Sequence, residues 1–157
     1  MHKFFIFYIL IFISCLTVAA CARETVRGEI ADGSVVAVRV GKNKLNLKVV
    51  NTEESRMRGL SGTKSVPNDG MLFLFGDKSV KVFWMKDMNY DIDIVWLGSG
   101  KVLGITENAK HEPQTADSDL IKYYSPLYCD SVIELVAGSA KKLNIQTGDT
   151  VQVIGKR

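Results

Sequence analysis

The sequence predicts an α+β, predominantly β domain: a small barrel-like mixed sheet of about seven or eight strands with one or two short helices. Three observations lead to this prediction. Apolar and β-branched residues recur in short runs bounded by glycine, asparagine or aspartate, as in strands joined by tight turns. Only two segments have the residue pattern of a helix, and both are short. The 157 residues correspond to one domain.

The first predicted elements are a hairpin and a short helix. The hairpin strands, residues 35–40 and 44–50, are rich in valine and leucine and flank a Gly-Lys-Asn turn. Thr52 is expected to cap a helix that ends near Leu60. Two glutamates follow Thr52 in the first turn, where the helix dipole favours negative charge, and glycines lie near the predicted end.

Four strands are predicted in the middle of the chain. Residues 71–75 and 80–85 are apolar over most of their length, which indicates burial on both faces, and a Gly-Asp-Lys break separates them. In residues 90–97 the side chains alternate, and a Gly-Ser-Gly turn joins this strand to residues 101–106. The alternation places one set of residues on one face: Tyr90, Ile92, Ile94 and Trp96. The other face receives Asp91, Asp93 and Val95.

The last third of the chain is predicted to contain a long loop, two strands and a short helix or turn. Residues 107–118 are polar, and a loop of this length is uncommon without a function. The strands are residues 131–136 and 150–154, with the helix or turn at 138–144 between them. Cys129 is expected to be a buried structural thiol, because no neighbouring base activates it.

The N-terminus has the order of a secretory signal. Lys3 is followed by an uncharged, largely apolar stretch that ends in small residues at Ala20. The sequence Val18-Ala19-Ala20-Cys21 resembles the lipobox of bacterial lipoproteins, in which the cysteine receives lipid. We therefore expect a signal peptide at 1–20, lipid attachment at Cys21, a tether at 21–34 and a single domain at 35–157. Ordinary cleavage after Ala20 or Ala22 and a retained anchor are the alternatives.

These features predict an exported protein that is attached to the bacterial cell envelope by its lipid, at the outer membrane facing the periplasm where there are two membranes. The whole chain carries a formal net charge of +3, and removal of the one lysine in the signal leaves +2, with no run of like charges. Nucleic-acid-binding domains are strongly basic, so nucleic acid is not expected as a partner.

The body of the chain contains a series of short sequence blocks. In chain order they are Arg58-Gly59-Leu60-Ser61-Gly62, Asp69-Gly70-Met71-Leu72-Phe73 with Phe75, Phe83-Trp84-Met85-Lys86, Ile92-Asp93-Ile94, Glu134-Leu135 with Ala137-Gly138, and Gly148-Asp149. Together they resemble the Domain of Unknown Function 192 family, also called uncharacterised protein family 0127. The resemblance covers about Leu45 to Ile154. It implies a compact, mostly β domain, often exported or membrane-attached, and no established activity.

The chain departs from the family pattern at three places. Asp87-Met88 follows the tryptophan block where the family usually has Asn-Thr, Asp91 stands where a proline is common, and Thr63 replaces an arginine.

Five residues of these blocks form the predicted ligand cleft: Arg58, Trp84, Met85, Lys86 and Asp93. They come from separate segments, and barrel-like folds bring strand ends together at one mouth, where ligands often bind. We expect Trp84 to form the apolar floor, Arg58 and Lys86 to supply cationic contacts and Asp93 to orient them. Such a cleft would favour an anionic or polar ligand with an apolar patch. No cofactor is expected.

The same residues also have a structural explanation. Trp84 and Met85 would plug the end of a barrel while Lys86 points to water. Asp93 would pair with an arginine of the preceding helix, Arg56 or Arg58, or cap a turn. His111 would be a solvated loop residue.

Three functional hypotheses follow. The first is a non-catalytic binding or accessory module at the membrane surface, which recognises a small ligand, an envelope polymer or a protein. The second is a hydrolase that uses Asp93 with Lys86 or His111, although no nucleophile motif is present. The third is a copper-handling protein that binds through Met85 and Met88, because thioethers are ligands for Cu(I).

Overall fold

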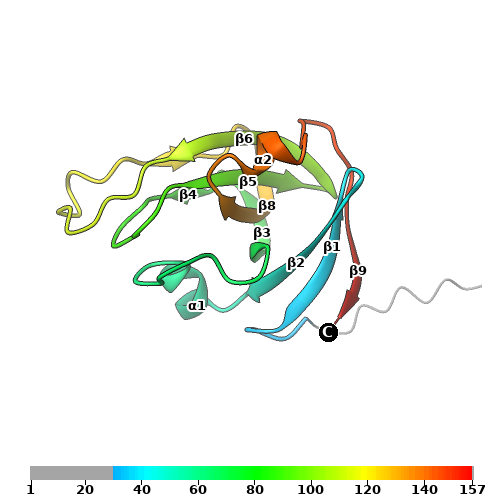
Figure 1. Ribbon diagram of the computed structural model, residues 1–157, viewed down its shortest axis with the longest axis horizontal. Helices are drawn as coiled ribbons and strands as arrows, with labels where there is room; N and C mark the ends of the chain where they lie inside the picture. The colour runs from blue at the N-terminus through cyan, green and yellow to red at the C-terminus, as the bar shows by residue number, and fades with distance from the viewer. Residues whose placement is uncertain (1–29, 157) are drawn as a thin grey trace, which may run out of the picture.

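The computed structural model describes residues 30–156 and confirms the predicted fold class (Figure 1). A seven-stranded sheet has the order β6-β5-β8-β3-β2-β1-β9, and a small second sheet pairs β4 with β7. The elements, in chain order, are β1 Val35–Val40, β2 Asn43–Val50, α1 Glu53–Arg58, β3 Gly70–Ser79, β4 Val82–Phe83, β5 Ile92–Gly98, β6 Lys101–Ala109, β7 Tyr123–Tyr124, β8 Cys129–Val136, α2 Ser139–Lys142 and β9 Val151–Lys156.

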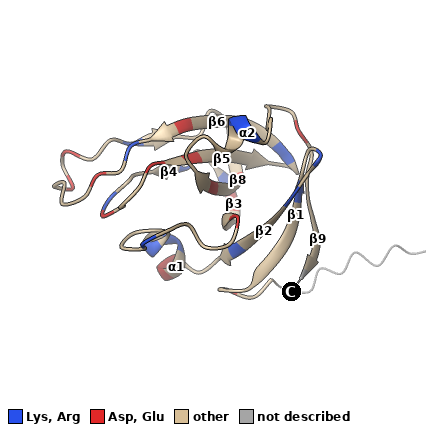
Figure 2. Ribbon diagram, viewed as in Figure 1, with Lys and Arg blue, Asp and Glu red and all other residues tan. Residues whose placement is uncertain are grey.

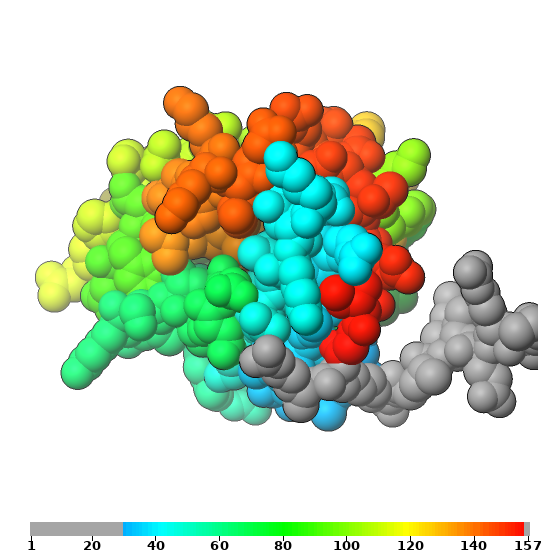
Figure 3. Space-filling view, turned by 45° about the vertical axis from the view of Figure 1, so that its right-hand side comes forward, coloured from blue at the N-terminus to red at the C-terminus, as the bar shows by residue number. Residues whose placement is uncertain are grey.

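The large sheet curls into a half-barrel because its two edge strands meet at one end. Lys101, at the start of β6, forms a β-bridge with Thr150, just before β9. Val102 adds two backbone hydrogen bonds of 2.9 and 2.8 Å, to the Asp149 carbonyl and from the Gly148 amide. β6 and β9 diverge from this contact (Figure 1), and β9 lies beside the β1–β2 hairpin in Figure 3. The prediction of a nearly closed sheet is confirmed in this form.

The two faces of the large sheet are buried against different sets of side chains. One face, here the aliphatic face, carries only valine, leucine and isoleucine in its buried core, from β1, β2, β3, β5, β6 and β8 and from Ile145. The opposite face, here the aromatic face, is built around Phe73 and Trp96 with methionines and further aromatic side chains. All seven residues of β5 are buried, because β5 has core on both sides.

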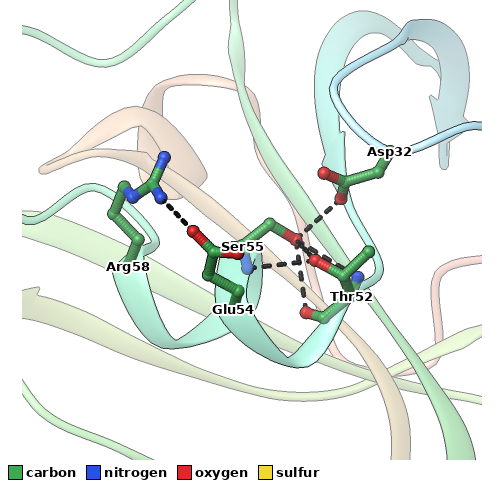
Figure 4. Close-up of polar contacts among 5 residues, drawn as sticks. All are labelled: Asp32, Thr52, Glu54, Ser55 and Arg58. Atoms are coloured by element: carbon green, nitrogen blue, oxygen red, sulfur yellow. Dashed lines mark hydrogen bonds and ion pairs between the residues drawn. The ribbon is translucent and has the colours of Figure 1, made fainter.

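The helix α1 is fixed by side-chain hydrogen bonds at its first turn and has no buried residue (Figure 4). Thr52 Oγ1 accepts from the Ser55 amide at 3.1 Å, and Ser55 Oγ accepts from the Thr52 amide at 3.2 Å. These reciprocal bonds form a capping box, which confirms Thr52 as the N-cap. The Ser55 hydroxyl also donates to Asp32 Oδ1 at 2.7 Å. This bond ties α1 to the segment before β1.

Two predictions in the middle of the chain are wrong. β3 does not end at Phe75 but continues to Ser79, with a shift of register against β8 after Leu74. The run 80–85 is not a buried strand, because only Val82–Phe83 pairs, and it pairs with β7. The chain leaves the large sheet after Ser79, and the Lys81 amide bonds to Ser125 Oγ at 3.0 Å instead.

The predicted loop 107–118 begins later than expected. β6 continues to Ala109, and a β-bulge accommodates the extra residues between the pairs Ile92–Ala109 and Ile94–Thr106. Asp91 holds the start of the remaining loop through hydrogen bonds from the Lys110 ammonium at 2.7 Å and from the His111 amide at 2.9 Å.

The predicted signal peptide 1–20 and the lipid site Cys21 lie outside the described residues. The described part of the predicted tether, residues 30–34, packs on the domain: Ile30 contacts the aliphatic core, and the Gly33 amide bonds to the Val49 carbonyl at 2.9 Å. The folded body therefore begins by Ile30. Within residues 30–156, no helix has the length and apolarity needed to span a membrane. Lysine and arginine residues alternate with aspartate and glutamate residues along the ribbon (Figure 2).

Candidate functional site

The five residues of the predicted cleft do not converge. Trp84 is half-exposed beside β4, whereas Met85 is buried in the core of the aromatic face. The Arg58 guanidinium pairs with Glu54 on the outside of α1 at 2.7 Å (Figure 4), and the Lys86 ammonium pairs with Asp117. This ion pair raises the pKa of Lys86.

Asp93 lies on the opposite face of the sheet from Trp84 and its neighbours. Its side chain is 0% exposed, and its two carboxylate oxygens accept from the Asn108 amide at 3.0 Å and the Ala140 amide at 2.9 Å. The first bond fixes the bulge of β6, and the second caps the N-terminus of α2. Asp93 is therefore a turn-capping structural carboxylate, as one of the sequence interpretations proposed, and no arginine within residues 30–156 bonds to it.

A pocket of about 220 Å³ opens on the aromatic face, between α1 and β4. Of the five predicted residues, only Trp84 lines it. The full lining is Glu53, Arg56, Met57, Gly59, Leu60, Ser61, Phe73, Phe75, Val82, Phe83, Trp84, Met88 and Glu134. An apolar concave surface with a few polar groups is the usual form of a small-molecule site.

Aromatic side chains build one wall of this pocket. The Phe83 ring contacts Phe73 at 5.0 Å between ring centroids and Trp96 at 5.5 Å, both edge to face. These contacts anchor β4, which has only two residues, to the large sheet. Trp84 follows directly and remains at the rim, 42% exposed. The buried lining comprises Leu60, Phe73, Met88 and Glu134.

Glu134 is the buried ionisable group of the pocket. It lies in β8, opposite Met71 of β3 and Ile94 of β5, and only 5% of its surface is exposed. Its Oε2 atom has no hydrogen-bond partner among the described residues. Burial without compensation raises the pKa of this carboxyl from its ordinary value of 4.5 to about 8. At neutral pH the carboxyl is therefore mostly protonated.

The cations near the pocket are already engaged. Arg56 Nη1 donates to the carbonyls of Asn51 and Leu74, the latter at 3.0 Å, and its guanidinium lies 5.2 Å from the centre of the Phe75 ring. Lys81 lies 4.3 Å from the same ring and pairs with Asp77 at 2.8 Å. Phe75 thus lies in contact with two cations.

Glycines of the sequence blocks allow the close approaches that shape the pocket. Gly59 ends α1 with a positive φ of 48°, and a Cβ there would lie 3.2 Å from the Phe73 ring. A Cβ at Gly70 would lie 2.5 Å from the Glu134 carbonyl oxygen. Two further blocks meet where the Ser61 hydroxyl donates to the Lys86 carbonyl at 2.8 Å. The blocks therefore hold the pocket walls together.

The residues of the other hypotheses lie elsewhere. His111 is exposed, and its Nδ1 lies 2.7 Å from Asp91 Oδ1. Together with Lys110, it holds the pKa of Asp91 well below its ordinary value. Met85 and Met88 are both buried in the aromatic core. Residues 30–156 contain no cluster of three or more His, Cys, Asp or Glu side chains suited to a metal ion. Cys129 is fully buried, as predicted, and burial raises the pKa of its thiol.

Sequence reasoning placed Glu134 in a block but missed it as a site residue. The available signal was a glutamate within the apolar run Val132-Ile133-Glu134-Leu135-Val136. Such a run predicts a strand with core on both faces, and a charged residue inside it is then buried whichever face it occupies. Arg56, two residues before the predicted Arg58, was named only as a partner for Asp93.

Comparison with known proteins gives a family and a fold. The model of the DUF192 family, described as Uncharacterized ACR, matches residues 36–153. A crystal structure from Sinorhizobium meliloti 1021, described as a candidate transcription regulator, is similar with a TM-score of 0.69 and 25% identity, covering 79% of this chain and 97% of that one. A protein of unknown function from Novosphingobium aromaticivorans DSM 12444 is similar with a TM-score of 0.65 and 25% identity, covering 75% and 84%. No curated protein matches the chain.

Proposed function

Because the chain belongs to the DUF192 family, whose description assigns no activity, its pocket is the best guide to function, and we propose that the protein is a binding module for a small, largely apolar ligand. The observation that carries the proposal is Glu134, a carboxyl at the buried side of an aromatic pocket with an unpartnered oxygen. The ligand would lie against the aromatic wall and supply the missing partner.

The physical argument is the cost of leaving that carboxyl unpaired. A buried polar group without a hydrogen bond destabilises a fold by roughly 1–3 kcal/mol, and most such groups in proteins do have a partner. An apolar residue of similar size would fill the same position on β8 without this cost. Strongly shifted pKa values of this kind cluster at functional sites. The position is therefore better explained by a ligand than by stability.

The lining favours binding over catalysis. A carboxyl with a raised pKa can act as a general acid or base, but the chemistry also needs a nucleophile or a second titrating group at hand. The hydroxyl in the lining, that of Ser61, is bonded to a backbone carbonyl. The hydrolase hypothesis relied on Asp93, which is buried on the other face with both oxygens bonded.

The test uses three phenyl compounds that differ in charge: 2-phenylethanol, 2-phenylethylamine and phenylacetate. A ligand that binds only the folded state raises the melting temperature. We expect at least one compound to do so in the wild type and to lose its effect in Trp84→Ala. Tyr128→Ala, which removes an exposed aromatic side chain outside this pocket, is the matched control and should keep the effect. A shift that survives Trp84→Ala, or no shift with any compound, would overturn the proposal.

The cellular location is part of the proposal. A basic start, an apolar stretch and the lipobox-like Val18-Ala19-Ala20-Cys21 support export and lipid attachment through Cys21, which would hold the pocket at the membrane surface. Metabolic labelling with a fatty acid should label the wild type and leave Cys21→Ser unlabelled. Absence of label in the wild type would contradict this location and leave the binding proposal intact.

A further inference from the structure

The pocket lining contains more acidic than basic side chains. α1 contributes Glu53 and Arg56 to the lining, β8 contributes Glu134, and the side chains from β3 and β4 are apolar. Partial burial, with a smaller effect of the Glu134 carboxylate, raises the pKa of Tyr90, which precedes β5 and whose hydroxyl hydrogen-bonds to Thr63. Arg56 is held by two carbonyls and a ring, so among the described residues of the lining Glu134 is the buried ionisable group with an unpartnered oxygen.

The neighbouring cations do not reach it. Lys81 pairs with Asp77, Lys86 with Asp117 and Arg58 with Glu54. The sequence predicted an anionic ligand because it treated Arg58 and Lys86 as free cationic contacts. With both paired outside the pocket, the expected charge of the ligand is reversed.

Resting on the proposed binding function, we infer that the ligand is a small organic cation, an ammonium group on an apolar body, whose charged end pairs with Glu134. The aromatic wall supports the same ligand class. Phe83 and Trp84 line the pocket, and a cation within about 6 Å of an aromatic face is attracted by the ring electrons. Phe75 already contacts two cations, which shows that this aromatic cluster accepts positive charge.

The protonation step can be written in full. In the empty pocket Glu134 carries its proton at neutral pH, because its pKa is about 8. Pairing with an ammonium stabilises the carboxylate, the O–H bond breaks, and the proton leaves to solvent while the ligand keeps its own proton. Binding is therefore coupled to the release of one proton. Below pH 8 the affinity should therefore increase roughly tenfold for each unit by which the pH is raised.

The experiment is calorimetric titration of the wild type with 2-phenylethylamine and its neutral analogue 2-phenylethanol at pH 6 and pH 8, in two buffers of different ionisation enthalpy. We expect the amine to bind more tightly than the alcohol at pH 8, to gain at least tenfold in affinity between pH 6 and pH 8, and to release close to one proton at pH 6. The alcohol should show neither pH dependence nor proton release. These measurements need no variant.

Glu134→Gln then removes the charge while keeping the shape. The amine should lose at least tenfold in affinity at pH 8, and the alcohol should bind as before. Glu54→Gln, the same change on the exposed side of α1, is the matched control and should alter neither. Tighter binding of the alcohol or of phenylacetate than of the amine, or amine binding without proton release, would overturn the cation inference and leave the binding function standing. If no compound binds, both fail.

Discussion

Two buried acidic residues lie in neighbouring residue pairs of β5 and β8 and differ in their hydrogen bonding. Asp93 of β5 stands opposite Leu135, and Glu134 of β8 stands opposite Ile94, so the two side chains point to opposite faces of the sheet. Asp93 accepts two backbone N–H bonds on the aliphatic face. Glu134 has an unpartnered oxygen on the aromatic face. The two acids are thus both buried, and the difference between them is that Asp93 is hydrogen-bonded and Glu134 has an unpartnered oxygen.

The largest expected effect is the loss of the satisfied acid. Asp93→Ala leaves the Asn108 and Ala140 amides without their acceptor, and we expect it to destabilise the fold by about 3–5 kcal/mol. Urea unfolding measures this difference in the free energy of unfolding. Asp117→Asn, at an exposed carboxylate, should change the free energy of unfolding by less than about 0.5 kcal/mol. A similar small effect at Asp93 would remove the contrast between the two faces.

The unsatisfied acid should appear in the pH dependence of stability. The pKa of Glu134 is about 8 in the folded state and 4.5 ordinarily, so the folded state keeps a proton that the unfolded state has released. Stability should therefore fall as pH rises from about 5 to 8, by an amount on the order of 1 kcal/mol per pH unit. In Glu134→Gln this component of the slope should vanish. Equal slopes in the two proteins would show that the carboxyl is paired.

A smaller effect on the free energy of unfolding is expected from the helix caps, which differ between α1 and α2. α2 is capped by Asp93 from a distant strand, whereas α1 is capped by its own Thr52 and has no buried residue. Thr52→Ala should cost about 1 kcal/mol, confined to α1 and the pocket wall. Amide hydrogen exchange should rise at Ser55 and Arg56 and not in β8. Faster exchange throughout the sheet would mean that α1 is coupled to the core.

The smallest effect is expected at Arg58. Its ion pair with Glu54 is solvent-exposed, so Arg58→Ala should change the free energy of unfolding by less than about 0.5 kcal/mol and leave ligand affinity unchanged. Arg56→Ala, which removes two hydrogen bonds to carbonyls, should cost more. The comparison is made by urea unfolding, and the reverse order would mean that the exposed ion pair of Arg58 contributes more to stability than the two hydrogen bonds of Arg56.

The alternation in residues 92–97 was sufficient to predict the two faces of β5, because a strand has a period of two. It could not identify the partners of Asp93, since they are backbone amides of Asn108 and Ala140, which no side-chain pattern reveals. The prediction of a buried strand at residues 80–85 was wrong for a related reason. Apolar residues indicate burial or a pocket rim equally well, and Trp84 belongs to the rim.

Among the strands that the structure describes, β2 and β3 form the one parallel pair, and this has a consequence for how relatives could diverge. Parallel neighbours cannot be joined by a tight turn, so the chain must cross over, and the crossover, residues 51–69, supplies α1 and one wall of the pocket. Insertions, deletions or exchanges within this connection would reshape the wall while strand register and the aliphatic core stay fixed. The shape of this wall is therefore free to evolve separately from the strands that hold the fold together.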